Sequence, residues 1–329
     1  MRALRNLVLL LAALGVGLLA GELGLRAAGF HFEPTLESVE FGWPNIEVRR
    51  ARYVADPDLF WVPPDYASRL ERLAGARPDL LFLGDSVTEW GRWPGLLLDG
   101  LHRAHPGAPL TAEALGTAGW SSYQGLQQLR RDVLPLRPRA LTLWFGWNDH
   151  WRGMGVDDAG VHEISRPRST WLRGLRWEQL WLKARLAWRA WRRGPASERV
   201  APEDFRRNLS QMTVLARSAG SVPVLVTAPT SQRPGAEPAQ LSPRWIEDLS
   251  RLVPLHRQYV EIVREVAARE GAVLCDLAAR FDALPDAERA SDFAADGIHL
   301  TLAGDRRAAA WLQECFEANA SLRALWQGS

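Results

Sequence analysis

Leu80-Leu81-Phe82-Leu83-Gly84-Asp85-Ser86-Val87-Thr88 is the stretch that decides the fold of this chain. Its first four residues form an uninterrupted apolar run, which indicates a strand buried on both faces. We expect a helix to begin just after Asp85. A serine placed between a buried strand and a helix meets unpaired N–H groups and the positive end of the helix dipole. Ser86 is therefore a candidate nucleophile, although Gly-Asp-Ser also occurs in ordinary turns.

Strand-like and helix-like segments alternate along the rest of the chain. The expected strands cover residues 80–83, 110–115, 140–145, 222–227 and 272–277, and the expected helices cover about 123–133, 202–219, 243–270 and 301–325. Short apolar strands that alternate with helices predict an α/β fold, in which helices cover both faces of a parallel sheet. Without its N-terminal segments the chain keeps roughly 250 residues, which is enough for one large domain.

The N-terminus has the pattern of a membrane segment. Residues 7–21 carry no charge, Arg2 and Arg5 precede them, and Glu22 ends the run. This run is short for a span of ~20 residues but sufficient when flanking side chains reach the interface. We expect residues 1–29 to be an uncleaved transmembrane anchor, with a cleaved signal peptide as the alternative. In either case the basic N-terminal end places the rest of the chain outside the cytoplasm.

Composition narrows the classes of partner and cofactor. The 40 basic and 38 acidic residues leave a net charge of +2, so we expect no nucleic-acid partner. The two cysteines, Cys275 and Cys315, cannot form a metal site alone, and we expect neither a metal nor a cofactor. In an exported domain they can form a disulfide, and two buried free thiols are the alternative.

Two further segments stand apart from the alternating pattern. Residues 30–77 are expected to be a leader that packs on a domain at 78–329, and residues 56–61 within it predict a turn followed by apolar packing. A helical insertion is expected at about 150–200. One stripe of it consists of Trp177, Trp181, Ala184, Trp188 and Trp191, with Arg185, Arg189, Arg192 and Arg193 to one side. Either these tryptophans pack on the domain, or the helix is a lid or lies at a membrane surface.

Two loops after predicted strands contain groups that can stabilise a negatively charged oxygen. Residues 115–122 include two glycines, which let the backbone approach a substrate and direct an N–H at it. Residues 146–149, Gly-Trp-Asn-Asp, end another strand. An asparagine amide placed there can donate to an oxyanion, which is worth about 3–4 kcal/mol in a transition state. Asn148 and Asp149 are alternatives for the functional role, and the other residue then holds the loop.

The segment Asp296-Gly297-Ile298-His299 supplies a base. An aspartate and a histidine three residues apart can meet across a tight turn, where the carboxylate holds Nδ1–H and leaves Nε2 free. Such a base converts a weak serine hydroxyl into a nucleophile. His150 follows the Asn148 loop and is a secondary candidate for the rim of the site. All four segments fall at the C-terminal ends of predicted strands or at the equivalent loop edge, where sites form in α/β proteins.

Together the segments resemble the SGNH/GDSL hydrolases, whose blocks are Gly-Asp-Ser, a glycine, Gly-x-Asn-Asp and Asp-x-x-His. The resemblance covers about residues 78–312 and implies a three-layer α/β/α, flavodoxin-like fold with a mostly parallel five-stranded sheet. The N-terminal segments also resemble bacterial membrane-anchored members. The resemblance implies catalytic roles for Ser86, Asp296 and His299, an oxyanion hole made by the N–H groups of Ser86 and Gly119 with the Asn148 amide, and supporting roles for Asp85 and Asp149.

The expected activity is that of a serine esterase, held by one span in the cell membrane, which forms an acyl-serine intermediate outside the cytoplasm. One alternative is an O-acetyltransferase or deacetylase acting on an acylated polysaccharide or peptidoglycan with the same nucleophile. Another is a binding module without catalysis on a hydrolase fold. The tryptophans beside the motifs can stack on sugar rings, line an acyl pocket or pack in the core; they are Trp90, Trp93, Trp120 and Trp147.

Overall fold

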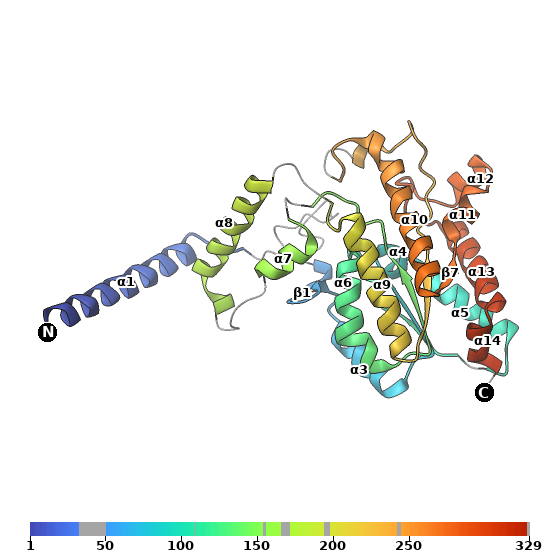
Figure 1. The fold of residues 1–329 in the computed structure, drawn as a ribbon, viewed down its shortest axis with the longest axis horizontal. Helices are drawn as coiled ribbons and strands as arrows, with labels where there is room; N and C mark the ends of the chain where they lie inside the picture. The colour runs from blue at the N-terminus through green and yellow to red at the C-terminus, as the bar shows by residue number, and fades with distance from the viewer. Residues whose placement is uncertain are drawn as a thin grey trace.

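A five-stranded parallel sheet forms the centre of the molecule in the computed structural model, which describes residues 1–32, 51–108, 110–153, 156–165, 172–193, 198–241 and 245–327 (Figure 1). The strands are β3 (Leu80–Gly84), β4 (Ala112–Ala114), β5 (Ala140–Trp144), β6 (Val222–Val226) and β7 (Val273–Cys275). Their spatial order, β4-β3-β5-β6-β7, is the flavodoxin-like order 2-1-3-4-5. The predicted fold and the five predicted strands are therefore confirmed.

Alternate residues of each strand pack on two separate layers of helices. Leu81 and Leu83 face one cluster and Leu80 and Phe82 face the other, as the period of two in a strand requires. The first cluster is covered by α3 (Tyr66–Ala76), α6 (Ser122–Gln128), α9 (Pro202–Ser218) and α10 (Leu252–Glu270). The second is covered by α5 (Trp93–Ala104), α11 (Leu277–Asp282), α13 (Leu302–Ala318) and α14 (Ala320–Gln327), while α12 (Asp286–Ser291) lies beyond α11. The result is the predicted three-layer sandwich.

In the structure, three helices differ from the prediction at one of their ends. The helix expected from residue 243 begins at Leu252, after Asp248 accepts the Ser250 N–H and starts a short 3-10 turn; Pro243 itself lies outside the described residues. The helix expected over 123–133 widens into a π-helical turn at residues 129–133. The last helix is two helices, because Asn319 is extended and its side chain accepts the Ser321 N–H to start the second.

The N-terminal helix α1 (Arg2–Ala27) projects away from the sheet domain (Figure 1). Its most apolar window has a mean hydropathy of 2.2, and only 6% of that window is buried. At ~1.5 Å per residue its 26 residues measure about 39 Å, against roughly 30 Å for a bilayer core. The helix can cross a membrane by length and composition, a test that a signal sequence also passes.

The described part of the leader, residues 51–77, packs on the domain through a hairpin of β1 (Val54–Asp56) and β2 (Phe60–Val62). The Asp56 carboxylate accepts the N–H groups of Asp58 and Leu59 and closes the turn. Phe60 and Trp61 follow that turn and are fully buried. The predicted turn with apolar packing at residues 56–61 is therefore confirmed, while residues 33–50 of the leader lie outside the described part.

Two helices form the described part of the insertion, α7 (Asp158–Ser165) and α8 (Arg176–Arg193). Its two ends pair at the base, where Arg199 N–H donates to Trp151 O at 2.8 Å and Val200 N–H donates to Asp149 O at 2.9 Å. The tryptophans of α8 are 38–80% exposed, so the interpretation that they pack on the domain is wrong. Residues 154–155, 166–171 and 194–197 of the predicted insertion lie outside the described part.

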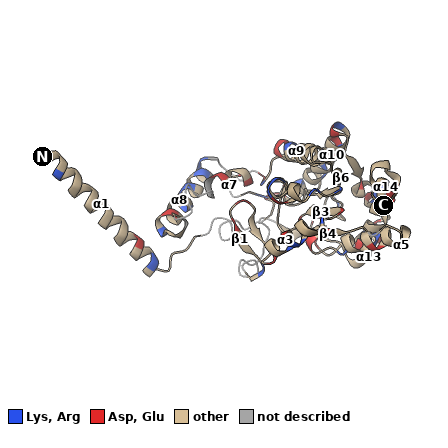
Figure 2. Ribbon diagram, turned by 90° about the horizontal axis from the view of Figure 1, so that it is seen from below, with Lys and Arg blue, Asp and Glu red and all other residues tan. Residues whose placement is uncertain are grey.

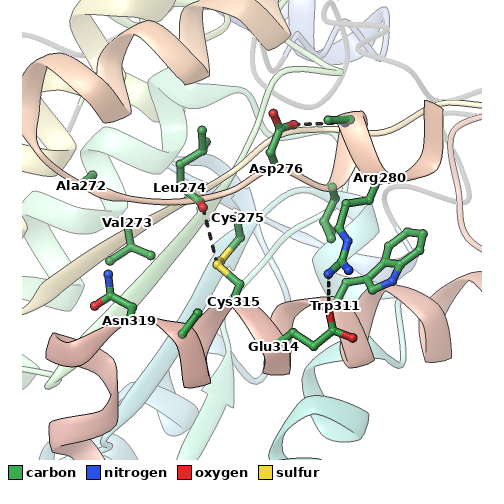
Figure 3. Close-up of a pocket in the computed structure, with 13 residues that line it drawn as sticks. Ala272, Val273, Leu274, Cys275, Asp276, Arg280, Trp311, Glu314, Cys315 and Asn319 are labelled. Atoms are coloured by element: carbon green, nitrogen blue, oxygen red, sulfur yellow. Dashed lines mark hydrogen bonds and ion pairs between the residues drawn. A yellow bond between two sulfur atoms is a disulfide. The ribbon is translucent and has the colours of Figure 1, made fainter. Parts of the chain in front are cut away.

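The two cysteines form a disulfide between β7, at the edge of the sheet, and α13 (Figure 3). The alternative of two free thiols is therefore wrong. Figure 3 shows the shallow pocket beside the bond, where Arg280 pairs with Glu314 at 2.6 Å and stacks on Trp311. None of the residues that line this pocket belongs to the candidate site, and we assign it no role.

Candidate active site

The turn from β3 to α4 (Ser86–Glu89) presents Ser86 at the carboxyl edge of the sheet. Asp85 caps α4, because its Oδ1 accepts the Val87 N–H at 3.0 Å. Glycine is required at residue 84: a Cβ there would lie 2.2 Å from Thr88 Oγ1 and 2.8 Å from Trp144 O. The turn is therefore tight, and its geometry directs the first residue of the helix toward the site.

Ser86, His299 and Asp296 form a continuous hydrogen-bonded chain. His299 Nε2 lies 2.8 Å from Ser86 Oγ, and His299 Nδ1 lies 2.6 Å from Asp296 Oδ2. Asp296 Oδ1 accepts the backbone N–H groups of Ile298 at 2.8 Å and His299 at 3.0 Å. The structure thus brings together three residues that lie as far as 213 positions apart in the chain. This arrangement can take a proton from the serine hydroxyl.

The loop that carries Asp296 is held by the segment after β6. Gln232 Nε2 donates to Asp296 O at 2.8 Å, and Thr230 Oγ1 donates to Gly297 O at 2.8 Å. Gly297 has a φ of +71°, and a Cβ there would lie 2.7 Å from Gln232 Cγ. The base is therefore positioned by backbone contacts to the sheet edge as well as by its own aspartate.

The loop with the predicted glycine is a tight turn over residues 117–120. Trp120 N–H donates to Thr117 O at 3.1 Å, and Gly119 has the φ of +80° that a type II turn requires at its third residue. The indole N–H of Trp61 donates to Ala118 O at 3.0 Å. In a trans peptide the C=O and the following N–H point in opposite directions. The Trp61 bond therefore directs the Gly119 N–H away from the leader.

A buried ion pair holds the other side of the same glycine. Arg199 Nη1 donates to Gly119 O at 2.7 Å, and Arg199 Nη2 lies 2.9 Å from Asp158 Oδ2. Both side chains are fully buried, and Ser121 Oγ also donates to Asp158 at 2.6 Å. Arg199 and Asp158 come from the two ends of the insertion. Sequence reasoning missed them, because no local pattern indicates a pair 41 residues apart.

Asn148 and Asp149, the two alternatives of the third motif, face different neighbours. Asn148 Nδ2 lies 3.1 Å from Asp85 Oδ2 and 3.0 Å from Trp120 O, between the serine turn and the glycine loop. Asp149 is buried, and its Oδ1 accepts the Ser122 N–H at 2.9 Å. The geometry places the amide of Asn148 beside the site and gives Asp149 a contact that holds the loop.

Burial and charge alter the pKa values of four site groups. Burial raises the pKa of Asp85 to about 6 and that of Asp149 to about 7. For His299, burial favours the neutral ring, but the hydrogen bond and charge of Asp296 and the charge of Asp85 outweigh it and raise the pKa. For Asp296, burial also opposes ionisation, but the hydrogen bond and charge of His299 and the backbone N–H groups of Ile298 and His299 together outweigh it and lower the pKa. Asp296 is thus ionised when His299 acts.

Glu89 is a further site neighbour that sequence reasoning missed. Its Oε2 accepts the Ala118 N–H at 2.6 Å and the hydroxyl of Tyr53, in the leader, at 2.8 Å. Burial raises its pKa. Glu89 lies one helical turn after Ser86, so α4 both carries the nucleophile and holds the glycine loop. The signal in the sequence was an acidic residue three positions after the serine.

Of the secondary candidates, His150 does not lie at the rim. It is buried, its Nε2 is 3.1 Å from His256 Nδ1, and burial lowers its pKa well below the usual range. Three of the tryptophans beside the motifs pack in the core and are at most 2% exposed: Trp93, Trp120 and Trp147. Trp90 differs, since it is 46% exposed and its ring centroid lies 5.2 Å from that of His299.

With this geometry in place, the comparisons with known proteins agree on the family. The family model described as GDSL-like Lipase/Acylhydrolase matches residues 82–307. The chain belongs to this family. The match contains Ser86 and His299 but begins after the leader. Tyr53, which bonds Glu89, and Trp61, which bonds the glycine loop, therefore lie outside the matched region.

Solved structures that are similar to this chain share little of its sequence. A lipase/acylhydrolase from Enterococcus faecalis is 18% identical over 73% of this chain and 95% of its own, with a TM-score of 0.48. A GDSL-like lipase from Parabacteroides merdae is 16% identical over 74% and 97%, with a TM-score of 0.50. An acetylxylan esterase from Geobacillus stearothermophilus is 15% identical over 75% and 94%, with a TM-score of 0.43. No curated protein matches the chain.

Proposed function

We propose that the protein is a serine esterase that cleaves an ester through an acyl-serine intermediate. The observation that carries the proposal is the unbroken chain from Asp296 through His299 to Ser86, with contacts of 2.6 and 2.8 Å. Family membership supports the reaction class. Both contacts fall within the range expected of an activated nucleophile and its base.

In the proposed reaction His299 Nε2 takes the Ser86 proton as Oγ attacks the ester carbonyl carbon. The resulting oxyanion accepts hydrogen bonds from the N–H groups of Ser86 and Gly119 and from Asn148 Nδ2, which exchanges one of its present acceptors for the substrate oxygen. His299 then gives its proton to the departing alcohol, leaving the acyl-serine. Water, deprotonated by His299, attacks the acyl carbon and frees the acid and Ser86.

We also propose that α1 anchors the enzyme and that the domain works outside the cytoplasm. The support is the apolar helix, the basic residues before it and the Cys275–Cys315 bond, since disulfides persist mainly in oxidising compartments. Treating spheroplasts, whose cytoplasmic membrane is intact and accessible, with a protease that cannot cross the membrane tests this. The domain is digested if it is outside and protected if it is inside.

Labelling with a serine-reactive fluorophosphonate tests the catalytic proposal most directly. We expect the folded protein to be labelled and to hydrolyse p-nitrophenyl acetate. Ser86→Ala should lose both properties and keep its thermal transition, because Ser86 is a small side chain at the edge of the sheet. If folded wild-type protein takes no label, the proposal is wrong and a binding role on a hydrolase fold is favoured.

One observation favours a second candidate function, acyl transfer to or from a glycan. The exposed ring of Trp90 beside His299 is placed to stack on a sugar at the point where an acceptor hydroxyl would approach. Incubation with an acyl donor, with and without an oligosaccharide, separates the two functions. An acylated sugar that forms faster than free acid favours transfer, and free acid alone favours hydrolysis.

A further inference from the structure

Helix α8 has two opposite apolar faces, of which one is covered. Gln179 and Leu182 are buried against the leader, and Leu186 is partly buried in the same cluster. The other face carries the tryptophan stripe, in which Trp181 and Trp188 are just over half exposed and Trp191 is 80% exposed. At 100° per residue the two faces lie on opposite sides of the helix. The large aromatic side chains are thus on the side that the domain does not cover.

The stripe lies on the side of α8 from which α1 departs. Trp177, the first residue of the stripe, donates its indole N–H to Leu18 O at 2.8 Å, and its ring packs against Gly21. Two further hydrogen bonds join the C-terminal end of α1 to the residues at the start of α8. Trp177 N–H donates to Glu22, and Arg26 donates to Gly174 O. The two helices are therefore joined at one end of the exposed face.

Both views of the molecule show α8 crossing the C-terminal end of α1 instead of running along it (Figures 1 and 2). The uncharged run of α1 ends at Gly21, so the contact with Trp177 lies where apolar residues give way to Glu22 and Arg26. If α1 crosses a bilayer, α8 then lies along its surface at the level of the lipid headgroups. Tryptophan is enriched at this level in membrane proteins.

The charges of α8 suit an anionic surface. The helix contains six basic residues and one acidic residue, and Figure 2 shows the basic residues along it. Arg185 lies over the Trp181 ring and Arg192 over the Trp188 ring, with 5.0 and 4.9 Å to the ring centroids. A cation stacked on an interfacial tryptophan is held where lipid phosphates lie.

We propose that α8 is an interfacial helix whose tryptophan stripe enters the headgroup region of the bilayer that α1 crosses. The partner is a lipid surface, and anionic lipids strengthen the contact. This inference rests on the proposed anchoring by α1. Its consequence is that the protein is held at the membrane at two points, α1 and the tryptophan stripe, instead of at α1 alone.

The test uses the full chain in vesicles of equal parts phosphatidylcholine and phosphatidylglycerol. Because the chain has two cysteines and the structure pairs them, a third cysteine can be labelled alone with the fluorophore NBD. The labelled variants are Trp188→Cys on the stripe, Leu10→Cys on α1 and Ala287→Cys on α12, at the far end of the molecule in Figure 1. Trp191→Cys replaces Trp188→Cys if that variant loses its cooperative urea unfolding.

We expect the emission of the label at residue 188 to shift to shorter wavelength in vesicles. Most of the emission intensity should be quenched when the lipids carry bromine near the headgroup. The label at residue 287 should show neither change. If the label at residue 10 is quenched but the label at 188 behaves like the one at 287, the anchor stands and the interfacial helix is wrong. Absence of quenching at both 10 and 188 would overturn the anchor and the interface with it.

Discussion

At the scale of the residue, the imidazole of His299 is under the influence of two carboxylates. Asp296 is bonded to Nδ1, and the charge of Asp85 acts from the serine turn. Together they outweigh burial and raise the pKa of His299 above its ordinary value of ~6.5. A base must be unprotonated to accept the serine proton, so we expect the proposed activity above this pKa and its loss as the pH falls through it.

The first prediction is therefore a kcat/KM profile whose acid limb has its midpoint above pH ~6.5. Asp85→Asn should move the midpoint to lower pH, because it removes a negative charge that favours the imidazolium. The measurement is ester hydrolysis from mildly acidic to mildly alkaline pH, with unfolding followed at each pH as the control. A midpoint that stays in place in Asp85→Asn would show that this carboxylate does not act on His299.

The residues of the proton chain could be predicted from the sequence, and their supports could not. Asp296 and His299 share one turn, so their meeting depends on local geometry alone. Trp61 and Glu89 reach the glycine loop only after the leader and α4 have folded against it. A single tryptophan or glutamate has no spacing that reveals such a contact. His150 was misplaced for the same reason, since its partner His256 comes from a distant helix.

At the scale of the element, two hydrogen bonds join the leader hairpin to the glycine loop, from Trp61 Nε1 to Ala118 O and from Trp120 Nε1 to Trp61 O. Only the first depends on the Trp61 side chain, and it holds the peptide of Gly119. The second prediction is that Trp61→Phe, which keeps an aromatic ring but removes the donor, lowers kcat by roughly 10-fold. The upper limit is the ~10²–10³-fold cost of losing one oxyanion donor entirely. KM should change less than kcat, because the peptide of Gly119 matters most in the transition state.

Tyr66→Phe is the matched control for Trp61→Phe. It removes a hydroxyl from the same hydrophobic cluster, which donates to Asp132 at 2.8 Å and accepts from Gln128 at 3.1 Å, and which has no hydrogen bond to the peptide of Gly119. Both variants should lose similar stability in urea unfolding. Equal kcat values for the two variants would mean that Trp61 serves packing alone.

The third prediction concerns the ion pair that joins the insertion to the glycine loop. Arg199→Ala leaves Asp158 charged and buried without its partner, which costs about 3–5 kcal/mol of the free energy of unfolding. The measurement is urea denaturation. The control is Arg206→Ala, which breaks surface pairs with Glu203 and Glu265 and should cost at most about 1 kcal/mol. Similar losses in both variants would contradict the importance of burial at Arg199.

Helices and strands were predicted best where the sequence pattern allowed only one arrangement. Most strands of the sheet are short and apolar, with a glycine or proline nearby, so they form where expected. The sequence of α8 predicts an amphipathic helix with two apolar faces, either of which could be the buried one. Which face is buried depends on whether another part of the molecule covers it. Leu182 and Leu186 meet the leader, whereas the larger tryptophans do not. The start of α10 also depends on tertiary contacts, because Ile246 is buried in the core ahead of the helix.

At the scale of the whole molecule, the disulfide ties the edge of the sheet to the C-terminal helices. The fourth prediction is that reduction lowers the free energy of unfolding by about 2–4 kcal/mol, since the bond closes a loop of 40 residues. Initial hydrolysis rates of the folded protein should change little, because the bond lies outside the site. Urea unfolding with and without reductant measures the first effect. A large loss of activity before unfolding would show that β7 and the His299 loop are coupled.

The leader hairpin has a practical consequence for any soluble form of the enzyme. A truncated chain designed from the family match would start near residue 82, and even a cautious one would start at the first strand of the sheet. The first would also lose Leu80 and Leu81 of the buried strand that carries Ser86, and both would lack Tyr53 and Trp61. We expect the second to keep its proton chain and still to bind the oxyanion poorly. Such a fragment would react with a phosphonate yet turn over esters slowly. A soluble fragment meant for kinetic work therefore has to begin upstream of Tyr53.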